Sequence, residues 1–172
     1  AGGGGLEQAE PVMVAGGQHG VAHARPPGLR HPGVGVKTLG GINDNLYFRS
    51  DASNLAAFLY ALKNRSGNHY TAIRDTIRQV APFFDDFLLD VTPFGEAQKV
   101  NLSWRQKGSD YPLQPYHLSA GSLRFICLVT ALLQPNPPAT IGIDEPELGL
   151  HPYAIALLAE LPSGDSEQPW RY

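Results

Sequence analysis

The sequence has only one cysteine and one methionine among its 172 residues. A single cysteine excludes an internal disulfide framework and fits a reducing compartment. Cys127 lies within the apolar run FICLVTALL, so we predict a buried core thiol rather than a catalytic one. No apolar run approaches the ~18 residues that cross a bilayer, and the glycine-rich start lacks the pattern of a signal peptide. We therefore expect a soluble, cytoplasmic protein with no membrane partner.

A strong excess of charge is also absent, since the net charge is -3. This balance argues against a dedicated nucleic-acid surface, which would need a basic stripe, but it leaves room for a DNA-linked process through a partner. Residues 1–41 are rich in glycine and proline, and we predict a disordered lead-in there. The domain would span 42–161 and an irregular tail 162–172. Because the pattern is lost at both ends, we interpret the chain as a truncated gene product.

The sequence contains no phosphate-binding P-loop. Such a loop needs the spacing G-x-x-x-x-G-K-[ST], in which backbone amides wrap the phosphates. The nearest string is HPGVGVKT at 31–38, where His31 and Val36 stand in place of the two glycines. A Walker A loop is therefore not expected in this chain.

Apolar spacing predicts two helices and a β-hairpin between about 43 and 105. Leu55 begins a helical repeat that Asp51 or Ser53 could cap. A second stripe begins at Tyr70 and ends before Pro82, which stops the helix. Two shorter runs predict the hairpin strands, FLLDV (87–91) and KVNLSWR (99–105).

The later part of the chain predicts a helix–strand–helix unit, which is the repeating element of an α/β sheet. Ser119 would cap the first helix, and Pro152 lies in the first turn of the second. Between them, ATIGI (139–143) is a short apolar run that suits a buried parallel strand. We expect an α/β fold whose sheet is incomplete.

Two motifs in this unit carry candidate chemistry. The first, LSAGSLR (118–124), places a serine and a glycine where a helix N-terminus can bind an anion, although plain helix capping would explain it as well. The second, IGIDEP (141–146), puts Asp144 and Glu145 at the carboxyl end of the predicted strand, where ligands of α/β sheets bind. A charged turn after an edge strand is its simpler alternative.

Together, LSxGxxR and the string DEPELGLHP that follows resemble the AAA/ABC-like predicted ATPases of the SMC/RecF-related branch, the AAA_21-like group. The resemblance runs from about Asp44 to Leu161. It implies part of a P-loop NTPase core of the ABC type, with a helical and β-hairpin insertion. The chain would supply the signature loop and Walker B half of that core.

Carried over residue by residue, the resemblance implies that Asp144 orders Mg²⁺ and that Glu145 is the catalytic group that activates or positions water for attack on the γ-phosphate of ATP. His151 takes the place of the polar D-loop residue that communicates across a dimer. For Arg124, contact with the neighbouring subunit and a solvated charge on the helix face both remain open. The residues expected to face the nucleotide of the opposite subunit are Ser119, Gly121, Ser122 and Arg124.

The function that follows is ATP binding and hydrolysis in a head-to-tail dimer, with the isolated chain inactive for want of a Walker A loop. An alternative is a non-enzymatic module that docks on a complete ATPase paralogue and lends it a signature loop. A third hypothesis is a metal-dependent hydrolase using Glu145, Glu147 and His151, whose spacing matches no common zinc pattern.

Overall fold

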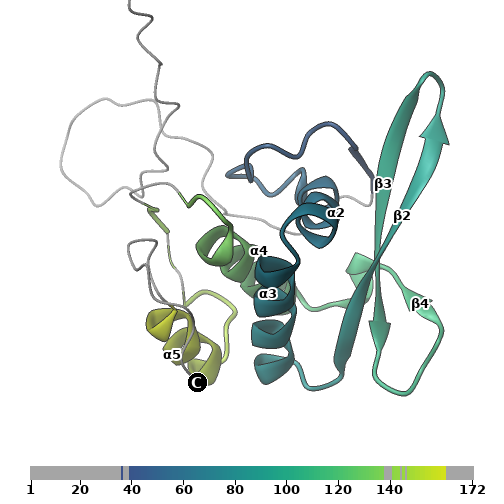
Figure 1. The fold of residues 1–172 in the computed structure, drawn as a ribbon. Helices are drawn as coiled ribbons and strands as arrows, with labels where there is room; N and C mark the ends of the chain where they lie inside the picture. Colours follow the sequence, from purple (N-terminus) through teal and green to yellow (C-terminus); the bar gives the residue numbers. More distant parts are fainter. Residues whose placement is uncertain (1–35, 37–38, 138–140, 144, 146, 162–172) are drawn as a thin grey trace, which may run out of the picture.

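A four-stranded antiparallel sheet and four α-helices make up the described part of the chain (Figure 1). The structure, a computed structural model, describes residues 36, 39–137, 141–143, 145 and 147–161. In chain order the elements are β1 (Leu39–Gly41), α2 (Leu55–Arg65), α3 (Gly67–Val80), β2 (Phe84–Phe94), β3 (Ala97–Gln106), β4 (Pro112–Leu113), the 3-10 turn η1 (Pro115–His117), α4 (Ala120–Leu133) and α5 (Pro152–Glu160).

The hairpin predicted from the alternating runs is confirmed, and it is longer than expected. Strands β2 and β3 pair until Phe94 lies opposite Ala97, so the turn consists of Gly95 and Glu96 alone. Gly95 has φ +60°, the left-handed conformation that tight hairpin turns require. Figure 1 shows this closed end of the hairpin extending past the helices.

Strand β1 corrects the predicted boundary of the lead-in at residue 41. Leu39–Gly41 pair with the middle of β3, and the side chain of Val36 is buried. Residues 1–35, 37 and 38, which include most of the HPGVGVKT string, lie outside the described residues. A three-residue strand has too few apolar side chains to show periodicity, because its stability comes from a partner strand distant in sequence.

Helix α2 buries the apolar stripe that was predicted for it, but its cap is a different residue. Asn54 is the N-cap, whereas Asp51 accepts a hydrogen bond from the amide of Ser53 at 3.0 Å. The Asn54 side chain is fully buried and makes three hydrogen bonds to the preceding loop, to Asp44 O, Tyr47 O and Arg49 N. A buried amide with such partners fixes the path of the loop before the helix.

The helices lie to one side of the β2–β3 hairpin (Figure 1). Helix α2 packs on the sheet, α3 packs between α2 and α4, and α5 contacts α4. Helix α4 is the most deeply buried of them, and the thiol of Cys127, which was predicted to lie in the core, is 0% exposed. The helix predicted after Ser119 and the helix predicted to begin near Pro152 are therefore confirmed as α4 and α5.

The parallel strand predicted at 139–143 is wrong for the residues of that run that the structure describes. Ile141 forms a single isolated bridge, and Gly142 and Ile143 have no regular structure. All three are only partly buried. A buried parallel strand must exchange hydrogen bonds with strands on both sides, and the strands of the described residues pair instead in an antiparallel sheet.

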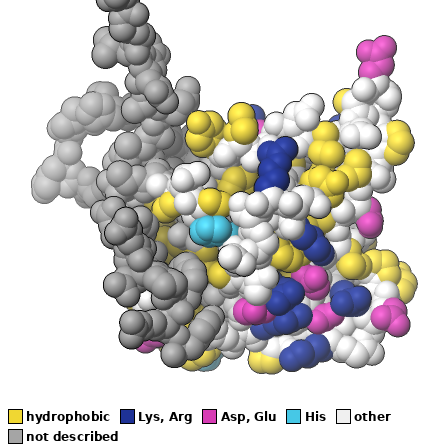
Figure 2. Space-filling model, in the orientation of Figure 1, with side chains coloured by type: hydrophobic (Ala, Val, Ile, Leu, Met, Phe, Trp, Pro, Cys, Tyr) yellow, Lys and Arg dark blue, Asp and Glu magenta, His cyan; other side chains and the backbone are white. Residues whose placement is uncertain are grey.

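The face of the molecule seen in Figure 2 carries acidic and basic side chains side by side rather than a basic stripe. Among the described residues, Asp85 forms ion pairs with Arg78 of α3 and Arg105 of β3, at 2.8 and 2.6 Å. Within the described ranges, none of the helices has the length and apolar character needed to span a bilayer.

Candidate functional site

The signature turn, defined here as residues 118–122, leads into α4 and is capped as the sequence predicts. The Ser119 hydroxyl oxygen accepts a hydrogen bond from the amide of Ser122 at 3.0 Å, and the two hydroxyls are 2.9 Å apart. Ser119 is exposed and Ser122 is partly exposed. The first amides of a long, buried helix therefore reach the surface beside two hydroxyl groups, an arrangement suited to an anion.

Gly121 brings the signature turn into direct backbone contact with the second motif. A Cβ placed on Gly121 would overlap the carbonyl oxygen of Gly149 and lie 3.1 Å from its carbonyl carbon. Gly149 itself has φ +75°, which favours glycine. The two motifs, separated by a whole helix in the sequence, therefore meet through two glycines.

A hydrogen bond also joins the same two segments. Arg124 lies in the second turn of α4, is 4% exposed, and its Nη2 donates a hydrogen bond to the carbonyl oxygen of Glu145. This burial excludes the alternative of a solvated charge on the helix face. The assignment of Arg124 to the nucleotide-facing set stays a prediction.

Glu145 stands in the acidic loop, defined here as residues 145–151, of which residue 146 lies outside the described residues. Glu145 has φ +47°, a left-handed conformation that is uncommon for a residue with a side chain. Its carbonyl oxygen also accepts the amide of Leu148 at 3.1 Å. Glu145 as a residue is exposed, although its carbonyl oxygen accepts both of these hydrogen bonds.

His151 is the N-cap of α5. Its Nδ1 accepts a hydrogen bond from the amide of Tyr153 at 3.2 Å, and the side chain is exposed. Ser119 and His151 thus occupy equivalent positions at the starts of two helices that pack together. The role of His151 in communication across a dimer stays a prediction.

The predicted metal residue Asp144 lies outside the described residues. For the third hypothesis, the residues concerned are all described, and Glu145, Glu147 and His151 do not gather into a group that could hold a metal ion.

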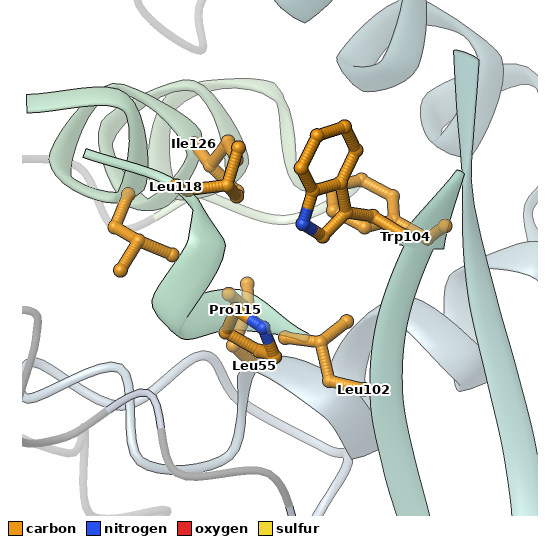
Figure 3. Close-up of a pocket in the computed structure, with 8 residues that line it drawn as sticks. Leu55, Leu102, Trp104, Pro115, Leu118 and Ile126 are labelled. Carbon is orange, nitrogen blue, oxygen red and sulfur yellow. The ribbon is translucent and has the colours of Figure 1, made fainter. Parts of the chain in front are cut away.

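Behind the signature turn lies a small apolar cavity (Figure 3). Its volume is about 10 Å³, room for about one water molecule, so it cannot hold a nucleotide. Trp104 of β3 closes it and donates its indole N–H to Gln114 O at 3.1 Å, just before η1. The cavity is lined by Leu55, Phe87, Leu102, Trp104, Pro115, Leu118, Leu123 and Ile126.

Two residues that support the site were not singled out from the sequence. Gly149 could have been identified from the sequence, because a glycine between Leu148 and Leu150 indicates a backbone conformation that other residues disfavour. Trp104 was assigned only to a strand. Its anchoring of the segment before the signature turn depends on tertiary contacts that no local pattern encodes.

Comparison with protein families gives a match over most of the chain. The model of the family described as "AAA domain, putative AbiEii toxin, Type IV TA system" matches residues 31–161. No curated protein and no solved structure matches the chain. The matched region covers more than half of the 172 residues and contains both motifs that meet at Gly121 and Gly149. The chain therefore belongs to this AAA domain family, an assignment that indicates a nucleotide-binding, ATPase-related domain.

Proposed function

We propose that this chain contributes a signature turn and the Walker B carboxylates Asp144 and Glu145 to an ABC-type ATPase that binds and hydrolyses ATP. The observation that carries the proposal is the contact of the two motifs, through Gly121 with Gly149 and Arg124 with Glu145. Helix capping and a charged turn would explain each motif alone. They do not require that the two turns be held against one another.

Each residue has a role that its surroundings permit. The exposed N-terminus of α4, with Ser119, Gly121 and Ser122, would bind the γ-phosphate of a nucleotide held by a second subunit. The exposed Glu145 carboxylate would orient the attacking water, and His151 would face the same partner. Asp144 would order Mg²⁺, which neutralises charge on the phosphates when bound.

The partner would be a second ATPase subunit in head-to-tail orientation or a complete ATPase paralogue. A site assembled in this way takes its phosphate cradle from one subunit and its signature turn from the other. This chain lacks the G-x-x-x-x-G-K-[ST] string, so a complete relative must provide the cradle in any test.

The test measures ATP hydrolysis by a complete family member whose own signature serine is replaced by arginine, with and without this chain. We expect the chain to restore hydrolysis, and Ser119→Arg to abolish that effect. Ser119→Asp is the sharper variant, because aspartate still caps the helix but repels the γ-phosphate. The proposal fails if the native chain restores nothing, or if Ser119→Asp restores as much as the native chain.

Glu145→Gln separates the two forms of the function. If the chain is a non-enzymatic module that lends only its signature turn, Glu145→Gln leaves the restored rate unchanged. If its own carboxylates take part in the chemistry, the rate falls by the ~10²–10⁴-fold typical of a lost general base.

A further inference from the structure

We infer that Arg124 is a positioning residue that holds the backbone of Glu145 in its left-handed conformation and so sets the direction of the Glu145 carboxylate. The catalytic meaning of this inference rests on the proposed function, whereas the structural claim does not. Through this hydrogen bond, helix α4 is connected directly to Glu145 within one subunit.

The backbone of Glu145 has an unfavourable conformation. Glu145 has φ +47° and precedes Pro146 in the sequence. A side chain disfavours the left-handed region, and a following proline pushes a residue towards extended geometry. The conformation therefore persists only if its surroundings hold it.

Hydrogen bonds to the carbonyl oxygen of Glu145 hold this conformation. Two donors converge on the Glu145 carbonyl oxygen, Nη2 of Arg124 and the amide of Leu148 at 3.1 Å. The Leu148 amide belongs to the same loop and moves with it. Arg124 belongs to α4, a buried helix whose position is fixed by the core. It is therefore the donor that ties the loop to a rigid element.

Arg124 and Glu145 differ in their exposure to solvent. Arg124 is 4% exposed and its Nη2 donates to the carbonyl oxygen of Glu145, while Glu145 as a residue is exposed. This hydrogen bond acts on the main chain of Glu145. The acid group thus stays available to water.

The experiment uses NMR of the isotope-labelled full chain. In the native chain the Glu145 Cα shift and its amide coupling should report a left-handed residue. We expect Arg124→Met, which removes the donors at similar length, to move both signals to extended values. Arg124→Lys, which keeps a cationic donor, should retain most of the native signal, and signals of Val129 in α4 should not move. A left-handed Glu145 in Arg124→Met, or equal loss in both variants, overturns the inference.

A thermal-unfolding cycle covers the case in which Arg124→Met folds poorly. Glycine adopts the left-handed conformation freely, so Glu145→Gly should raise the Tm of the native chain by a few degrees. It should give a smaller rise when combined with Arg124→Gln, whose shorter side chain cannot place a donor where Nη2 lies. Ala52, which has φ +55° and is fully buried just before α2, is the matched control. Ala52→Gly should shift the Tm equally in both backgrounds. A fall in Tm for Glu145→Gly, or an equal rise in both backgrounds, overturns the inference.

Failure here is distinguishable from failure of the proposed function. If Arg124 holds Glu145 but the chain restores no hydrolysis to a complete relative, the inference stands as structure and the ATPase assignment of Glu145 falls. If hydrolysis is restored and Glu145 keeps its conformation without Arg124, only the inference falls.

Discussion

Gly121 is the residue on which the approach of α4 to the acidic loop depends. Any side chain there meets the backbone of Gly149, and backbone cannot rotate away as a flexible side chain can. The contact is therefore intolerant of even one added methyl group.

We predict that Gly121→Ala lowers the free energy of unfolding by about 1–3 kcal/mol, the range for overpacking. Urea denaturation of the purified chain measures it. Gly67→Ala is the matched control, because Gly67 begins α3 and has nothing within 4 Å of an added Cβ. That control should be neutral or stabilising by up to ~1 kcal/mol. Equal losses in the two variants would show that the Gly149 contact is not the cause.

Cys127 is fully buried in α4, and burial raises the pKa of its thiol to about 12. We predict no reaction with a thiol reagent at pH 8 in the folded chain and rapid reaction after denaturation, since the thiolate is the reactive form. Because the folded pKa lies above the unfolded one, the stabilising contribution is complete below about pH 8.5 and is lost as the pH rises towards 12. Modification of the folded chain at its unfolded rate would contradict this burial.

At the scale of elements, ion pairs help to join α3 to the hairpin. Asp85 of β2 forms ion pairs with Arg78 of α3 and Arg105 of β3. The hydrogen bond from Arg105, helped by the charges of both arginines, lowers the pKa of Asp85. These pairs are partly exposed, so their main consequence is a dependence of stability on pH and salt.

We predict that the Tm of the native chain falls more steeply below pH 4 than that of Asp85→Asn. A lowered folded pKa means that the stabilising contribution is present above the unfolded pKa of about 3.9 and is lost as the pH falls through the folded value. Thermal melts between pH 6 and 2 measure the difference. Asp90→Asn, an exposed position on the same strand, should follow the native profile, and a native-like profile for Asp85→Asn would refute the assignment.

At the scale of the whole molecule, the sequence predicted the elements that carry their own periodicity. The helical repeats of α2 and α3 and the alternation of apolar and polar residues in β3 needed no tertiary information. The cap of α2 was missed because Asn54 is fixed by a loop that wraps back on it.

The remaining differences have the same kind of cause. Strand β1 was missed because its hydrogen bonds go to β3, about sixty residues later. The described part of the predicted strand, residues 141–143, was misassigned because a short apolar segment fits a buried strand and an irregular segment equally well. In the site, motif spacing identified the two turns, but the contacts of Gly121 and Arg124 exist only in three dimensions.

The whole chain is predicted not to bind ATP tightly on its own. Its sequence offers no loop whose amides can wrap the phosphates, and a signature turn alone supplies too few contacts. Isothermal calorimetry with ATP and Mg²⁺ should give no micromolar binding, with a complete family member as the positive control. Tight micromolar binding by the isolated chain would refute the prediction.

The reach of the β2–β3 hairpin beyond the helices has a practical consequence for labelling. Glu96 is exposed in a two-residue turn, whereas Cys127 is fully buried. A maleimide dye added to Glu96→Cys would therefore attach at one site while the native thiol stays in place. The dye at the hairpin tip would then report the distance to a second subunit that binds this chain.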